Sequence, residues 1–379
     1  MKIGLYTHNF PVMNCYWEQL KKKTDCWWGV PEKKLFELLK LKKIKKVVFS
    51  EEKYFKDKNK KKGNQFVTKN NIKAQKEIIK KINPDLWIVD TPNKLTILKK
   101  GTPVIQTLHS LPIKKHVFYK PYLNSNLILL PGKYHYNEFR KRFGKDLKKT
   151  TLKIVGWPRL DGLIKNKYNR KKILKKFGLD EKKKTVTYAP TWGWGEGNSS
   201  LFCRWHKKEL EVFERICALI YQLNLNFIIR LHSLSFLTKN KKMIKIANKY
   251  GVHWQTKETS NYQDDPNETL WVTDILISDL SGIISEYLIL DRPIIYIDPI
   301  KNSKAWKESD MPKNFRVGHI VKSFKELKHA IQDSIFFPNR FKRQRNILKK
   351  NLFSRLNGSA GKFAANVILK FANTKLRYN

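Results

Sequence analysis

The stretch TDILISDLSGIISEYLILDRPIIYID, Thr273–Asp298, decides the fold class. An apolar run at Asp274–Ser278 is followed by the small polar turn Asp279–Gly282, an apolar segment of helical length at Ile283–Leu290 and a second apolar run at Pro293–Ile297. Short apolar strands that alternate with helices are typical of β-α-β units, in which parallel strands are buried on both faces. The stretch therefore predicts an α/β fold.

The same alternation continues on both sides of this stretch. Further strands are expected at Lys2–Thr7, Lys45–Ser50, Asp85–Asp90, Pro103–His109, Asn126–Pro131, Leu152–Trp157, Thr185–Ala189, Asn226–Leu231 and Val252–Gln255. Helices are expected at Pro31–Leu41, Ile72–Lys81, Tyr134–Phe143, Arg170–Phe177, Lys207–Leu223, Thr238–Tyr250 and Ser359–Ala372. We predict two Rossmann-like domains that face each other across a cleft, with an acceptor-side domain at 1–160 and a nucleotide-donor domain at 161–379.

Composition excludes several classes of protein. With 379 residues, 41% of them hydrophobic and 12% aromatic, the chain is long and apolar enough for two cores and is not a disordered chain. No apolar run reaches the roughly 20 residues that span a bilayer. The four cysteines form no C-x-x-C pair, and the Cys203–His206 spacing has no second pair to complete a zinc site. We expect a cytoplasmic protein that is soluble or peripherally attached to a membrane, with no cofactor and no metal.

The formal net charge of +46 has two interpretations. It can attract an anionic partner, such as a membrane surface, a phosphate-rich polymer or nucleic acid, or it can reflect a lysine-rich composition on a solvated surface. No recognition-helix or RNP-like motif accompanies the charge, and the lysines are dispersed in short clusters. Nucleic acid is therefore the less favoured partner.

Two histidines follow predicted strands, one in each half of the chain. His109 comes directly after a strand, with Lys114 five residues later, and His232 follows a strand that contains Arg230. Parallel α/β sheets place reactive groups at the carboxyl ends of their strands, and a histidine there can act as a general base near neutral pH. A loop histidine without a role, or a core histidine bonded to a carbonyl, remains the alternative.

Two further motifs are candidates for ligand binding. The segment TYAPTWGWGEGNSS, Thr187–Ser200, runs from a strand into a glycine-rich loop that contains Thr191. Ser281 and Gly282 fall at the start of a predicted helix, where backbone N–H groups attract anions, and Asp279 precedes them. A surface loop, a simple helix cap at Ser281 and a turn residue at Asp279 are the alternatives.

Together these motifs resemble the CDP-glycerol glycerophosphotransferase family, the teichoic-acid and capsule primases and polymerases with a GT-B-type fold. The resemblance covers roughly Pro103–Val321 and departs from the family pattern in four places. It is carried in order by His109-Ser110 with Lys114, Gly156-Trp157-Pro158-Arg159-Leu160-Asp161, Tyr188-Ala189-Pro190-Thr191-Trp192, Arg230-Leu231-His232-Ser233, Asp279-Leu280-Ser281-Gly282 and Asn314–Val321. The departures are Ser110 for Gly, Ser233 for Pro, Leu280 for an aromatic residue and Gly282 for Ser.

The resemblance implies transfer of glycerol-phosphate, or a related polyol-phosphate, from CDP-glycerol to a hydroxyl of a lipid-linked or surface-glycan acceptor at the inner face of the membrane. The expected catalytic residues are His109 and His232. The expected donor and phosphate contacts are Arg230, Ser281, Gly282, Thr191, Asp279 and Lys114. A nucleotide-sugar glycosyltransferase of the same fold, a basic nucleic-acid-binding protein and an inactive homologue are the alternatives.

Overall fold

The structure is a computed structural model of the 379-residue chain. It describes residues 1–7, 9–51, 69–91, 102–108, 111, 118, 120–190, 209–231, 241–255, 266–279, 281–297 and 315–376. The chain divides into two compact units. Unit 1 comprises Met1–Ser110, Phe118–Asp161 and Leu352–Asn379, and unit 2 comprises Leu111–Val117 and Gly162–Asn351.

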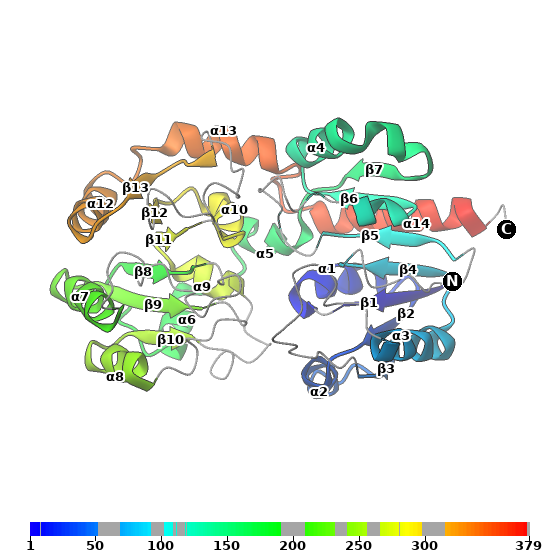
Figure 1. Ribbon diagram of the computed structural model, residues 1–379, viewed down its shortest axis with the longest axis horizontal. Helices are drawn as coiled ribbons and strands as arrows, with labels where there is room; N and C mark the ends of the chain where they lie inside the picture. Colours follow the sequence, from blue (N-terminus) through cyan, green and yellow to red (C-terminus); the bar gives the residue numbers. More distant parts are fainter. Residues whose placement is uncertain are drawn as a thin grey trace. The chain divides into compact units, whose positions relative to one another are not determined.

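Unit 1 is built on a seven-stranded parallel sheet in the order β3-β2-β1-β4-β5-β6-β7 (Figure 1). Its strands are β1 (Lys2–Tyr6), β2 (Asp25–Val30), β3 (Val47–Phe49), β4 (Leu86–Val89), β5 (Val104–Gln106), β6 (Leu127–Leu130) and β7 (Thr151–Ile154). Every residue of β4 and β6 is buried, which explains why their sequences are apolar throughout rather than alternating. The strand order reverses direction between β1 and β4, so their carboxyl ends form a switch point of the kind that binds ligands.

The helices of unit 1 are α1 (Phe10–Leu20), α2 (Lys33–Leu41), α3 (Lys69–Ile82), α4 (Lys133–Phe143) and α14 (Ala360–Leu376). Among the described residues of unit 1, three 3₁₀ turns accompany them, η2 (Lys120–Asn124), η3 (Gly144–Lys149) and η4 (Pro158–Leu160). Asn9 caps the start of helix α1, where its side chain accepts the N–H of Val12, and Pro11 occupies the first turn, where a missing N–H costs nothing.

The final segment of the chain returns to unit 1, where α14 packs against α1. The Asp161 carboxylate accepts the backbone N–H groups of Ala360 and Gly361 at 3.1 and 2.8 Å. Gly156 has a φ of +88°, and a Cβ there would stand 2.7 Å from the Cβ of Ala360. The Gly156–Asp161 motif therefore fixes the start of α14. The sequence-based division at residue 160 instead grouped this helix with the second domain.

Unit 2 contains a six-stranded parallel sheet in the order β10-β9-β8-β11-β12-β13. Its strands are β8 (Thr185–Tyr188), β9 (Asn226–Arg230), β10 (His253–Gln255), β11 (Ile275–Ser278), β12 (Ile294–Ile297) and β13 (His319–Val321). The order reverses between β8 and β11, which places a second switch point at their carboxyl ends. With both sheets parallel and doubly wound, the predicted α/β class of the two units is confirmed.

Helices cover both faces of this sheet (Figure 1). They are α5 (Asp161–Ile164), α6 (Arg170–Lys176), α7 (Glu209–Gln222), α8 (Lys241–Lys249), α9 (Pro266–Val272), α10 (Ile283–Tyr287), α12 (Phe324–Phe336) and α13 (Lys342–Leu352), with the 3₁₀ turn η7 (Leu288–Leu290). Strand β9 shows the two-residue period: Phe227 and Ile229 join the core under α7 and α8, while Ile228 joins the core under α6 and α9.

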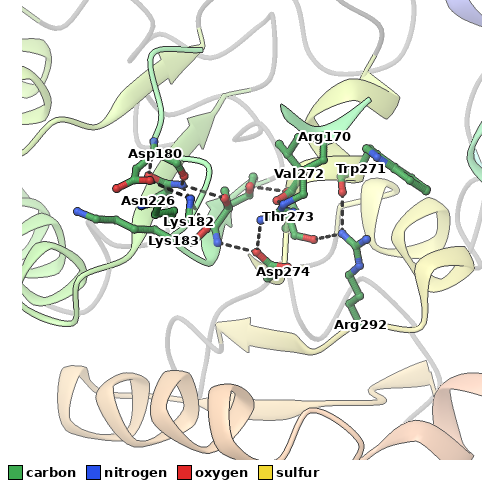
Figure 2. A network of polar contacts seen from close by, with 12 residues as sticks. Arg170, Asp180, Lys182, Lys183, Asn226, Trp271, Val272, Thr273, Asp274 and Arg292 are labelled. Carbon is green, nitrogen blue, oxygen red and sulfur yellow. Dashed lines mark hydrogen bonds and ion pairs between the residues drawn. The ribbon is translucent and has the colours of Figure 1, made fainter. Parts of the chain in front are cut away.

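A polar network ties together the amino ends of β8 and β11 (Figure 2). Arg170 of α6 donates to the Asp274 carboxylate at 2.7 Å, and the same oxygen accepts the backbone N–H of Thr185 at 2.7 Å. Arg292 donates to the carbonyl of Thr273 at 2.5 Å. These contacts fix the amino edge of the sheet, opposite the edge at which its strands deliver side chains for ligand binding.

The helix that follows β11 is shorter than predicted. The expected single helix Ile283–Leu290 is divided into α10 and η7, and it ends at Asp291 in a left-handed conformation with φ 52°. Arg345 of α13, only 1% exposed, donates from Nε to the Asp291 carboxylate at 2.8 Å and from Nη2 to the carbonyls of Asp291 and Pro338 at 3.0 Å each. This buried arginine therefore fixes the end of the turn-and-helix segment that runs from Asp279 to Asp291.

Candidate functional site at the carboxyl edge of the second sheet

The carboxyl ends of β8, β9, β10 and β11 bring several predicted residues to one edge. Gln255, the last residue of β10, is the register partner of Arg230, the last residue of β9. Asp279 follows the end of β11, and β8 lies between β9 and β11. Because neighbouring strands are about 4.8 Å apart, Arg230 and Asp279 project from strands about 10 Å apart on the two sides of the switch point.

Arg230 is held by two neighbours. Its Nη1 donates to Oε1 of Gln255 at 2.9 Å and to Oγ1 of Thr269 in α9 at 3.4 Å, and Thr269 Oγ1 donates to the same Gln255 oxygen at 3.0 Å. Gln255 and Thr269 are 2% and 1% exposed. These two buried side chains form a frame that fixes the half-buried guanidinium of Arg230, and a fixed guanidinium is the geometry that recognition of a phosphate oxygen requires.

Gln255 contributes a second feature to this frame. A guanidinium has only donors, so the carboxamide oxygen of Gln255 must face Arg230 and its Nε2 must face away. That nitrogen is buried and has no hydrogen-bond partner among the residues that the structure describes. Gln255 carries no motif in the sequence, and its place in the site depends on the register between β9 and β10.

The two central motifs of the second half are joined directly. Ser278 Oγ, at the end of β11, donates to the carbonyl of Ala189 at 2.5 Å, and the N–H of Ala189 donates to the carbonyl of Ile277 at 2.9 Å. The Tyr188–Trp192 motif and the Asp279–Gly282 turn therefore begin at the carboxyl ends of two neighbouring strands, β8 and β11, which hydrogen-bond to each other there. Asp279 itself is 2% exposed, so it is not a solvated turn residue.

The turn after Asp279 differs in detail from the predicted anion site. The residue that caps α10 is Gly282, and no side chain accepts a hydrogen bond there, so the interpretation of Ser281 as a side-chain cap is wrong. The N–H groups of Ile284 and Ser285 donate to the carbonyls of Ser281 and Gly282. With α10 limited to five residues, attraction of an anion rests on the backbone N–H groups that precede Ile284 more than on a long macrodipole.

Four predicted residues, His109, Lys114, Thr191 and His232, lie outside the described residues. Leu108 and Leu231, which directly precede the two histidines in the sequence, are buried just beyond β5 and β9. The roles of these four residues stay predictions. Within the described ranges, no group of three or more His, Cys, Asp or Glu side chains is arranged to hold a metal ion.

Unit 1 carries a matching row of polar side chains at its own switch point. Thr7 follows β1, Asp90 follows β4 and Thr107 follows β5, and all three are at most 1% exposed. Thr7 Oγ1 donates to the Asp90 carboxylate at 2.7 Å. Asp90 was predicted to lie at a strand end and had no predicted role, and the two threonines belong to no motif that would identify them from the sequence.

Comparison with known proteins decides the family. The model of the CDP-glycerol:poly(glycerophosphate) glycerophosphotransferase family matches residues 23–370. The chain belongs to this family. The family resemblance inferred from the motifs is therefore confirmed, including the prediction of a transferase of this family.

Two relatives connect the family to cell-wall polymers. The teichoic acid ribitol-phosphate polymerase TarL of Staphylococcus aureus is 28% identical over 152 residues, which cover 40% of this chain and 25% of TarL. This chain thus matches about a quarter of the length of TarL. A structure of a variant of the wall teichoic acid polymerase TagF soaked with CDPG has a TM-score of 0.68 at 18% identity, over 99% of this chain and 89% of the chain in that structure.

The fold also extends outside the glycerophosphotransferase family. A structure of S. aureus MnaA with UDP has a TM-score of 0.64 at 15% identity, over 98% of this chain and 97% of MnaA. These structural likenesses confirm the fold class. Among the described helices, none is long and apolar enough to cross a bilayer.

Proposed function

We propose that this protein transfers glycerol-phosphate, or the related ribitol-phosphate, from its CDP-activated form to a hydroxyl of a lipid-linked or glycan acceptor in cell-envelope polymer synthesis. The observation that carries the proposal is the family match over residues 23–370. The family description names CDP-glycerol and poly(glycerophosphate), and TarL is named for a ribitol-phosphate polymer. Both polyols are therefore included.

The chemistry is a single displacement at phosphorus. The acceptor hydroxyl oxygen attacks the phosphorus that bears the polyol, the bond from that phosphorus to the bridging oxygen breaks, and CMP leaves with the electron pair. His109 takes the proton of the attacking hydroxyl. Positioning and charge stabilisation supply most of the rate in phosphoryl transfer, so the remaining residues act by holding the pyrophosphate.

The donor end is assigned to the carboxyl edge of unit 2. Arg230, held by Gln255 and Thr269, offers a fixed guanidinium to the pyrophosphate oxygens. The turn before α10, at Ser281 and Gly282, offers backbone N–H groups. His232, Thr191, Asp279 and Lys114 complete the proposed contacts.

The place of action follows from the same proposal. We infer a peripheral protein at the inner face of the cell membrane, because the donor is a water-soluble nucleotide and the acceptor is membrane-linked. A net charge of +46 favours adhesion to anionic lipid, at about 1 kcal/mol per well-placed basic residue.

The test is release of CMP by the purified protein with CDP-glycerol, CDP-ribitol and UDP-N-acetylglucosamine, each with a lipid-linked acceptor. Turnover of a CDP-polyol and none of the nucleotide sugar is expected, and the reverse pattern would establish the glycosyltransferase alternative. His109→Ala and His232→Ala should each lower kcat at least about 100-fold without unfolding. His329→Ala, on the exposed face of α12, is the matched control and should keep full activity.

A further inference from the structure

An exposed apolar corner joins α12 to α13. Phe336, the last residue of α12, is 72% exposed, and Phe337 is 59% exposed. With Pro338, Asn339 and Arg340 they line a hollow of about 390 Å³. Two adjacent aromatic rings in water are unfavourable, and such apolar groups mark surfaces that bind a partner. We call Phe336–Arg343 the α12–α13 corner.

The corner is also strongly basic. Its sequence, FFPNRFKR, contains three exposed basic residues, Arg340, Lys342 and Arg343, and no acidic residue. Arg340 is partly neutralised because its guanidinium lies 2.5 Å from the Asp333 carboxylate and also 5.4 Å from the centre of the Phe337 ring. Lys342 and Arg343 add two positive charges in the first turn of α13.

The backbone of the corner is fixed from within. The N–H of Arg340 donates to the carbonyl of Phe337 at 3.1 Å, and the N–H of Lys342 donates to the carbonyl of Asn339 at 2.9 Å. The buried Arg345 donates to the carbonyl of Pro338 at 3.0 Å. The two rings are therefore presented on a formed turn, so that docking through them loses little backbone entropy.

We propose that the α12–α13 corner docks the protein on an anionic membrane surface. Aromatic rings settle at the boundary between lipid headgroups and acyl chains, and nearby basic side chains are attracted to anionic headgroups. A soluble polyanion would use only the charges and would gain nothing from two apolar rings. The proposal deepens, and rests on, the peripheral attachment inferred above.

The corner lies away from the donor end of unit 2. His319 at the start of β13 contacts Asp333 near the end of α12 at 2.7 Å, so α12 ends at the amino edge of the sheet. Arg230 and Asp279 occupy the carboxyl edge. Substitutions in the corner therefore leave the proposed donor site intact.

The experiment is co-sedimentation of the full chain with vesicles of phosphatidylglycerol and phosphatidylcholine, and with vesicles of phosphatidylcholine alone. Wild type should bind only the anionic vesicles. The Phe336→Ser/Phe337→Ser variant should bind them at least about tenfold more weakly. The affinity of the Lys342→Gln/Arg343→Gln variant for the anionic vesicles should fall about 25-fold, at about fivefold per basic residue. The control variant Lys172→Gln/Lys175→Gln removes the same charge from exposed positions of α6. Its affinity for the anionic vesicles should fall less than about twofold.

Three results would overturn the proposal: no binding of wild type to anionic vesicles, wild-type affinity in the double phenylalanine variant, or an equal loss by that variant of binding to soluble poly(glycerophosphate). Equal unfolding midpoints establish that the variants are folded. CMP release with a soluble acceptor is measured in parallel and should be unchanged in every corner variant. Vesicle binding needs no CDP-polyol, so failure of the docking proposal is distinguishable from failure of the proposed transferase activity.

Discussion

The guanidinium of Arg230 donates to the carboxamide oxygen of Gln255 over 2.9 Å, across the carboxyl ends of two neighbouring parallel strands. Thr269 donates to the same oxygen, and the amide nitrogen of Gln255 is left buried without a partner in the described part of the chain. Gln255 therefore positions the guanidinium of Arg230 through its carboxamide oxygen, while its nitrogen is a buried donor that faces away from Arg230.

Replacing Gln255 with Leu is expected to lower kcat/KM for the CDP-polyol about 10- to 100-fold, because a hydrogen bond to a charged group contributes about 1.5–3 kcal/mol. Gln255→Glu keeps the acceptor that faces Arg230 and should recover most of the loss. CMP release over a range of donor concentrations measures both effects. The Arg230→Ala/Gln255→Leu double variant should be no worse than Arg230→Ala, and strictly additive losses would contradict a positioning role.

Gly282→Ser, which restores the residue that the family motif carries, should fold normally and keep or raise activity. The φ of Gly282 is −60°, and among the described residues a Cβ there would meet only the carbonyl oxygen of Leu111, at an ordinary 3.7 Å. Gly318→Ala is the contrasting variant, because its added Cβ would clash with the backbone carbonyl of Ile294. This variant should lower the free energy of unfolding by about 1–3 kcal/mol. Thermal unfolding of both variants checks the difference, and a destabilised Gly282→Ser protein would contradict it.

Arg345→Met should lower the free energy of unfolding by about 3 kcal/mol, because it leaves the Asp291 carboxylate and the Pro338 carbonyl without their buried partner. Arg343→Met, two residues earlier and exposed on the same helix, should change the free energy of unfolding by less than about 0.5 kcal/mol. Urea denaturation of the two variants measures the difference. Equal stabilities would show that the buried pair contributes nothing net.

Stability should fall in mild acid because of His135 in α4. Its ring is fully buried beside Phe118 and Tyr134, neither ring nitrogen has a partner among the described residues, and burial lowers its pKa to about 3. The folded state holds it neutral, while the unfolded chain protonates below about pH 6.5. Its contribution to stability is therefore complete above pH 6.5 and lost as the pH falls toward 3, by about 2 kcal/mol at pH 5.

His135→Phe should remove this part of the pH dependence. Urea unfolding at pH 7 and at pH 5 measures the effect. Between these two pH values the free energy of unfolding should fall by about 2 kcal/mol more in wild type than in the variant. His329→Gln, at an exposed position of α12, serves as the control and should behave like wild type. An identical acid loss in His135→Phe would show that other groups account for it.

Local pattern predicted most elements of the fold. The apolar runs that predict strands near Lys2, Asp85 and Asp274 appear as β1, β4 and β11 within one or two residues, because burial on both faces demands an apolar sequence. Strand β2 and helix α1 were missed, since DCWWGV and FPVMNCYWEQL lack a clear period of two or of 3.6. Which unit α14 joins was not predictable, because it depends on the distant Asp161.

The candidate site was predictable in part. Strand ends and motif order pointed to Arg230 and Asp279, which the structure brings to one edge of one sheet. The frame around Arg230 was not predictable, since Gln255 and Thr269 reach it through strand register and helix packing. The same holds for the bond between Thr7 and Asp90, which lie 83 residues apart in the sequence.

The return of α14 to unit 1 determines the order in which the protein can be completed during synthesis. Unit 2 is contained in one continuous stretch from Gly162 to Asn351, apart from the short segment Leu111–Val117, and so all its residues are translated before α14 begins at Ala360. Unit 1 begins earlier yet waits for the helix that packs against α1. The half of the chain that is translated first is thus the half that finishes folding last.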